Sequence, residues 1–406
     1  MQKGSWSLAD QWLFSGANFV ANVLLARWLS PVEYGAFALG YTIFLLLAAL
    51  HTAVLTDPML IFGAGRYRHQ LNRYLWFLFA CHVGVSIVAF SLLGSGAWLA
   101  RSFEAAELSR ALWGVALASP LILFAWLLRR AFYIDAQPAR AALGSLVYLF
   151  TLLGGLVLLW NRGLLSAFSA FLAMGVASLV VSAILIILLN LRGYQKIGSK
   201  VFGSMLANQW SYARWSGPTS FLIWIPLNVF FVAITYSSSL EGAASLRALT
   251  NLLTPMMQST LAISNLVIPD FSRIHIEQGK RALLRRATSL IAPFLAISLS
   301  YWALLWLLRT QLFSILYGGH YLEVSGLLLL AGSIPVAFGI AVILESTLRA
   351  LERPQSIFRG YLLASIAAGT IGVFLTIQWQ LPGAILGQIF AFVILALSLL
   401  HSLRKT

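Results

Sequence analysis

The sequence predicts an all-α polytopic membrane protein with two bundles of six transmembrane helices each. Composition is the first indication, because 60% of the residues are hydrophobic and only 10% are charged, with a mean hydropathy of +0.86. A soluble domain carries about 25% charged residues, so this chain cannot cover a soluble surface. Apolar runs of the length that crosses a bilayer recur along the whole chain, and the cationic residues cluster in the short connections between them.

A transmembrane helix needs roughly 20 apolar residues, and this rule predicts about twelve spans. In the first half they cover 6–28, 36–62, 74–99, 111–128, 141–160 and 167–190. In the second half they cover 209–236, 243–271, 287–309, 323–348, 358–378 and 382–402. The connection 191–208 joins the two halves, so we expect an N-terminal bundle at 1–190, a cytoplasmic linker at 191–208 and a C-terminal bundle at 209–406.

The cationic side chains predict the topology. Alternate connections hold 20 of the 27 Lys and Arg residues, the opposite side holds six, and Arg214 falls inside a span. By the positive-inside rule, both termini are expected in the cytoplasm. The same alternation accounts for much of the net charge of +15 and argues against a nucleic-acid partner. One cysteine, Cys81, excludes an internal disulfide.

The halves share weak internal similarity. The first begins with Leu8–Trp12 (LADQW) and the second with Leu206–Trp210 (LANQW). Both motifs stand at equivalent points in the span count and in the same orientation, which favours a parallel two-fold repeat. This is the architecture of a transporter whose two bundles surround a central cavity.

Charged residues inside the spans are the candidates for function, because we find no metal-ligand, nucleophile or nucleotide-binding pattern. No cofactor is expected. A charge near the bilayer centre costs about 2.5–3.5 kcal/mol on insertion scales, so it usually faces a cavity. The candidate cavity cations are Arg214, Arg247 and Arg27. For Arg214 the alternative is a side chain that reaches to the interface, and for Arg27 it is an ion pair with Glu33.

Polar and acidic residues in the spans complete the candidate site. Asn251 lies four residues after Arg247, so the two share a helix face, and Asn18 and Asn22 are expected to line the cavity. Asp57 and Glu345 are candidates for ion coupling. The alternative is that each pairs with a neighbouring arginine, as the four-residue spacing of Glu345 and Arg349 suggests.

Four stretches resemble one known family. They are Asn18–Arg27 with its Ser30–Gly35 elbow, Leu246–Pro255 with Ile268 and Pro269, Leu316–Gly318, and Leu348–Pro354. Together they resemble bacterial polysaccharide-biosynthesis flippases of the multidrug/oligosaccharidyl-lipid/polysaccharide (MOP) exporter superfamily, so the bundles are expected to be MATE-like.

The resemblance implies a flippase rather than an enzyme, one that moves an undecaprenyl-pyrophosphate-linked oligosaccharide between leaflets by alternating access. It further implies the bacterial inner membrane as the location, with membrane lipids, a polysaccharide polymerase and assembly proteins as partners.

Two alternatives remain open. A multidrug extruder of the same fold would favour an acidic or apolar cavity, whereas the intramembrane charge here is mainly cationic. A membrane oligosaccharide polymerase or ligase usually needs a larger outer loop than this chain offers.

Overall fold

The computed structural model describes residues 2–191 and 197–405, which are helical nearly throughout and contain no strand. Residues 192–196, part of the expected linker 191–208, lie outside the described residues. The chain divides into two compact units, Met1–Phe221 and Leu222–Thr406, and the division falls within a helix. The predicted all-α membrane fold is confirmed.

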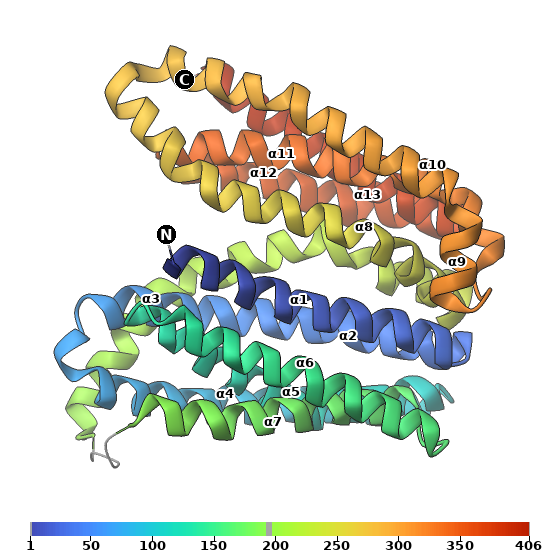
Figure 1. The fold of residues 1–406 in the computed structure, drawn as a ribbon, viewed down its shortest axis with the longest axis horizontal. Helices are drawn as coiled ribbons and strands as arrows, with labels where there is room; N and C mark the ends of the chain where they lie inside the picture. The colour runs from blue at the N-terminus through green and yellow to red at the C-terminus, as the bar shows by residue number, and fades with distance from the viewer. Residues whose placement is uncertain (1, 192–196, 406) are drawn as a thin grey trace. The chain divides into compact units, whose positions relative to one another are not determined.

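The first unit is a bundle whose long helices run alongside one another (Figure 1). Its elements are α1 (Gln2–Trp28), α2 (Pro31–His51), the π-helical turn η1 (Thr52–Thr56), α3 (Asp57–Ala64), η2 (Arg68–Gln70), α4 (Leu71–Ser102), α5 (Ala106–Ile134), α6 (Pro138–Asn161), α7 (Ala167–Leu189) and the first turns of α8 (Ser199–Leu307). Helix α5 packs against α2, α4 and α7, while α1 packs against α6.

Small residues let these helices approach closely. A Cβ added to Gly114 on α5 would lie 3.0 Å from the carbonyl oxygen of Phe168 on α7. A Cβ added to Gly175 on α7 would lie 3.2 Å from Ala118 on α5. Helix pairs in membranes rely on such close packing, because lipid provides no hydrophobic force to bring them together.

The Ser30–Pro31 elbow gives α2 a defined start. The Ser30 hydroxyl accepts a hydrogen bond from the Glu33 N–H at 3.3 Å, and proline occupies the first helical position, where no N–H is needed. The Glu33 carboxylate in turn accepts from the N–H of Ala167, the first residue of α7, at 2.8 Å. It also pairs with Arg110 of α5 at 3.1 Å. One carboxylate therefore joins α2, α5 and α7 at this end of the unit.

The π-helical turn η1 follows from the sequence Asp57-Pro58. Pro58 has no N–H to offer the carbonyl of Val54, and the N–H of Asp57 bonds to Thr52 rather than to Ala53. The carbonyls of Ala53 and Val54 are thus left outside the helical ladder. Side chains of α8 satisfy them, because Ser216 donates to the Ala53 carbonyl and Gln209 donates to the Val54 carbonyl, each at 2.8 Å.

The second unit contains the rest of α8, followed by α9 (Arg309–Tyr317), η3 (Leu322–Leu327), α10 (Leu328–Ala331), α11 (Ser333–Ala350), α12 (Pro354–Ala367), η4 (Ala368–Gly372) and α13 (Val373–Lys405). Helix α8 has 109 residues and would be about 160 Å long if straight. Non-helical backbone at Ser239 and Gly279 divides it, and Gln380 divides α13 in the same way.

Each of these three breaks lies between two spans that the sequence predicts. Eight helical segments among the described residues are long and apolar enough to cross a membrane, and two of them contain the breaks. The count of twelve spans therefore stays an expectation, whereas the alternation of long apolar helices with short connections is observed.

Candidate functional site

A buried ion pair lies within the first unit. Asp10 of α1 is 2% exposed, and its carboxylate lies 3.5 Å from Nε of Arg129 on α5, which is 7% exposed. The Tyr133 hydroxyl donates to Asp10 at 2.6 Å, and the Ser145 hydroxyl of α6 also donates to it. Both carboxylate oxygens are therefore occupied. We call these four residues the Asp10 cluster.

Aromatic rings enclose the Asp10 cluster on one side. The guanidinium carbon of Arg129 lies 3.9 Å from the ring centre of Phe14, which is a favourable cation–π distance. Phe14 also contacts the rings of Trp126 and Tyr148, at 5.5 and 5.0 Å between centres. The cation is thus held by a carboxylate and by a ring from the same helix, α1.

The two asparagines expected in the cavity continue along α1. Asn18 accepts from the Tyr148 hydroxyl at 3.3 Å and donates to the Phe14 carbonyl at 2.9 Å. Asn22 is 6% exposed and donates to the Asn18 carbonyl at 2.9 Å. Among the described residues, none donates a hydrogen bond to the Asn22 side-chain oxygen, which is buried. Asn22 thus offers an acceptor inside the unit.

Sequence reasoning missed the Asp10 cluster. The sequence indicates Asp10 only as part of the repeated LADQW motif, and Arg129 falls just after the predicted span 111–128. The available signal was Asp10 itself, since a carboxylate inside an apolar run of this length needs a partner.

The second unit buries Arg247 of α8. This side chain is 8% exposed, and its guanidinium carbon lies 4.1 Å from the ring centre of Phe231. Asn251, one turn away and 6% exposed, hydrogen-bonds the hydroxyl of Tyr317 on α9. Tyr317 also donates to the Ala248 carbonyl at 2.8 Å. The structure therefore brings together Arg247 and Asn251, as their spacing predicts, and adds Tyr317 and Phe231.

The other two candidate cations lie in different surroundings. Arg214 is exposed on α8, with its guanidinium carbon 5.7 Å from the ring centre of Trp215. Arg27 is exposed in the last turn of α1. The Glu33 carboxylate forms an ion pair with Arg110 of α5. Neither candidate shares the burial of Arg247.

The two carboxylates proposed for ion coupling also differ. Glu345 is buried on α11 and accepts from Arg349 at 2.5 and 2.9 Å and from the Tyr361 hydroxyl at 2.8 Å. It forms the ion pair predicted by its four-residue spacing from Arg349. Asp57 is half-buried at the first position of α3, within electrostatic range of Arg130. Across the described residues, no group of three or more His, Cys, Asp or Glu is placed to hold a metal ion.

Comparison with solved structures identifies the architecture. An inward-facing multidrug resistance MATE family transporter of the MOP superfamily superposes with a TM-score of 0.79 at 13% identity, covering 98% of this chain and 96% of that one. The chain has the fold of the MOP-superfamily transporters.

Two further MOP-fold structures agree with this assignment. The lipid II flippase MurJ, in an inward closed conformation, gives a TM-score of 0.75 at 14% identity over 100% of this chain and 87% of that one. A MOP superfamily transporter from Pyrococcus furiosus, described by the reverse polarity of its binding pocket, gives a TM-score of 0.65 at 13% identity. The superposition covers 99% of this chain and 91% of that one. No protein-family model and no curated protein matches the sequence. The predicted MATE-like architecture is thus confirmed at the level of the fold.

Proposed function

We propose that this MOP-fold protein is a flippase that moves an undecaprenyl-pyrophosphate-linked oligosaccharide from the inner to the outer leaflet of the bacterial inner membrane by alternating access. In this proposal both termini lie in the cytoplasm. A polysaccharide polymerase and assembly proteins are its expected partners, and no covalent step is assigned to the chain. The fold supports a transporter, and the electrostatics of the interior support an anionic substrate.

The observation that carries the proposal is that the buried carboxylates Asp10 and Glu345 are already paired with cations. Asp10 and Glu345 each accept hydrogen bonds on both oxygens and each pair with an arginine. A carboxylate that is already neutralised offers little attraction to a cationic drug, because its charge is compensated before the drug arrives. An anionic substrate has no such obstacle.

Arg247 is the proposed contact for the pyrophosphate. A guanidinium stays charged in a low dielectric and donates two parallel hydrogen bonds to phosphate oxygens. The Phe231 ring beneath it stabilises the cation, and Asn251 adds a polar neighbour for the phosphate or sugar. Arg214 and Arg27 remain in the proposal as further cations, and Asn18 and Asn22 as sugar contacts.

The test uses proteoliposomes that contain a fluorescent lipid-linked oligosaccharide and a membrane-impermeant quencher. A charge-assisted hydrogen bond contributes about 1.5–3 kcal/mol, so Arg247→Ala should slow flipping by roughly 10-fold to 100-fold. Arg273→Ala is the matched control, because Arg273 also lies on α8 but is 67% exposed and pairs with Asp270 at the surface. Flipping at the wild-type rate by folded Arg247→Ala would contradict the proposal.

A multidrug extruder is the second candidate, favoured by the TM-score of 0.79 with a MATE transporter. The same vesicles distinguish the two functions. Uptake of cationic dyes without flipping of the glycolipid would support the extruder and exclude our proposal.

A further inference from the structure

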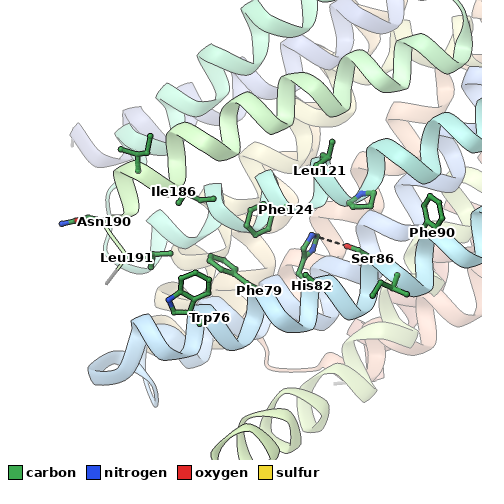
Figure 2. Close-up of a pocket in the computed structure, with 14 residues that line it drawn as sticks. Trp76, Phe79, His82, Ser86, Phe90, Leu121, Phe124, Ile186, Asn190 and Leu191 are labelled. Atoms are coloured by element: carbon green, nitrogen blue, oxygen red, sulfur yellow. Dashed lines mark hydrogen bonds between the residues drawn. The ribbon is translucent and has the colours of Figure 1, made fainter. Parts of the chain in front are cut away.

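A groove in the first unit shares no lining residue with the Asp10 cluster. It lies between α4, α5 and the end of α7 and has a volume of about 790 Å³ (Figure 2). One stripe of α4 forms a side wall that runs from Trp76 to Phe90, with its residues three or four positions apart. Residues of α5 around Leu121 form the opposite wall. We call this space the α4–α5 groove.

The two polar side chains midway along the α4–α5 groove already have partners within the unit. Nε2 of His82 lies 3.3 Å from the Ser86 hydroxyl, and Nδ1 of His82 lies 3.0 Å from Nε2 of His51 on α2. The residues around them in the groove are aliphatic or aromatic, such as Phe79 and Phe124. An occupant therefore needs no hydrogen-bonding group along this length, and an apolar chain suits the walls.

The two ends of the α4–α5 groove differ. At one end the ring centre of Phe90 lies 6.0 Å from that of Trp113 on α5, and a Cβ added to Gly94 of α4 would lie 3.2 Å from the Trp113 ring. Helices α4 and α5 thus come together beyond Phe90. The other end lies at helix termini, because Trp76 is in the second turn of α4 and Asn190 caps α7. The predicted spans begin and end here, so this end lies at the membrane–water interface.

The length of the α4–α5 groove matches a phospholipid acyl chain. Helix α4 rises about 21 Å between Trp76 and Phe90. One leaflet contributes about 15 Å of hydrocarbon, so one acyl chain fits with its glycerol near Trp76, at the depth that tryptophan rings favour. An undecaprenyl chain is much longer than one leaflet is deep, and the groove ends where Phe90 meets Trp113.

Two arginines adjoin the interfacial end of the groove. Arg140 of α6 is exposed and donates to the carbonyl of Leu188, in the last turn of α7, at 2.9 Å. Arg73 precedes Trp76 by one turn of α4, and its Nε has no hydrogen-bond partner among the described residues. A guanidinium has five donors, so the bond to Leu188 leaves others on Arg140 for a phosphate. The charge at this end thus complements an anionic headgroup.

We propose that the α4–α5 groove binds one acyl chain of an anionic glycerophospholipid, whose phosphate is bound by Arg73 and Arg140. The apolar walls hold the chain, and the two cations select the headgroup, because a zwitterionic lipid brings a compensating amine to the same place. The bound lipid connects α4 with the end of α7. Binding requires no transport, so this proposal does not depend on the proposed function.

Photolabelling in vesicles tests the proposal. The protein is reconstituted in phosphatidylcholine with a small fraction of a probe lipid, either phosphatidylglycerol or phosphatidylcholine, and both probes carry the same diazirine on the acyl chain. Mass spectrometry then locates the labelled residues. We expect labels on the groove walls of α4 and α5. Each cation near the membrane surface favours an anionic lipid by about fivefold, so the phosphatidylglycerol probe should label the groove about 5-fold to 25-fold more efficiently.

Adjacent residues of α4 provide a matched pair of variants for the chain. Ile87 and Val88 are 61% and 59% exposed, but only Ile87 lines the groove. Ile87→Trp should lower groove labelling by both probes by roughly tenfold, because the indole displaces about two methylenes of the chain. Val88→Trp should leave it unchanged. A second pair tests the headgroup: Arg140→Gln should lower the preference for phosphatidylglycerol by about fivefold, whereas Arg130→Gln, at an exposed arginine of α5, should retain it.

Several outcomes would overturn the proposal. Equal labelling by the two probes would remove the headgroup site, and labels spread evenly over the exposed residues of the first unit would remove the groove. Displacement of the phosphatidylglycerol probe by undecaprenyl phosphate at lower concentrations than by unlabelled phosphatidylglycerol would show that a polyprenyl lipid is the occupant. Selective groove labelling together with absent glycolipid flipping would instead refute only the proposed function.

Discussion

Replacing Asp10 by alanine should destabilise the first unit strongly. The change removes the carboxylate that faces Arg129 at 3.5 Å and leaves the hydroxyls of Tyr133 and Ser145 without their acceptor. Arg129 remains buried with an uncompensated charge. Breaking a buried ion pair in this way costs about 3–5 kcal/mol.

Thermal unfolding of the detergent-solubilised protein measures this loss. For a unit of this size each kcal/mol shifts the midpoint by about 2–4 °C, so we expect Asp10→Ala to unfold about 10 °C below the wild type. Asp135→Ala is the matched control, since Asp135 is exposed at the end of α5 and should leave the midpoint unchanged.

A double variant separates the charge from the packing. Removing both charges, as in Asp10→Ala with Arg129→Met, leaves no buried cation, so it should recover much of the stability lost in Asp10→Ala. Unfolding of Asp10→Ala within about 2 °C of the wild type, which corresponds to roughly 1 kcal/mol or less, would refute this reasoning. The reasoning would also be refuted if the loss of stability in the double variant equalled the sum of the losses in the two single variants.

Three further predictions follow from particular contacts. Gly387→Ala places a Cβ 2.8 Å from the Cα of Gly372, so it should destabilise the second unit by about 1–3 kcal/mol in the same unfolding assay, while Gly369→Ala, which meets nothing within 4 Å, should not. Glu33→Gln weakens the bonds to Arg110 and to the N-terminus of α7, so it should lower the free energy of unfolding by roughly 1–2 kcal/mol and thereby lower the unfolding midpoint. An unchanged midpoint would argue against the three-helix connection. In a Cys81→Ala background, Ser102→Cys should react with an impermeant maleimide from outside cells and Ser199→Cys only after permeabilisation; the opposite pattern would reverse the topology.

Much of the fold follows from local sequence. The apolar runs and the cationic connections predict the spans, and the backbone breaks at Ser239, Gly279 and Gln380 lie in connections that those patterns place. The elbow at Ser30–Pro31 is also predictable, because serine at the N-cap and proline at the first helical position are preferred signals for the start of a helix.

The interior contacts were less accessible, because they depend on which helix faces lie together. Glu345 and Arg349 lie on one helix, so their spacing alone predicts the ion pair. Asp10 on α1 and Arg129 on α5 are 119 positions apart, and both helices pack against α6, which brings the two side chains into range. His51 of α2 and His82 of α4 are 31 positions apart, and their ring nitrogens lie 3.0 Å from each other because both helices pack against α5. Glu33 likewise pairs with Arg110 of α5, which is 77 positions away in the chain.

The carboxylate of Glu33 has a consequence for how this bundle can change during evolution. It fixes α2, α5 and α7 to one another at one end, while α2 is interrupted by η1 toward its other end. Substitutions near Glu33 therefore alter all three helices at once and are expected to be rare in related chains. Substitutions beyond η1 alter only the eight residues of α3 and their neighbours.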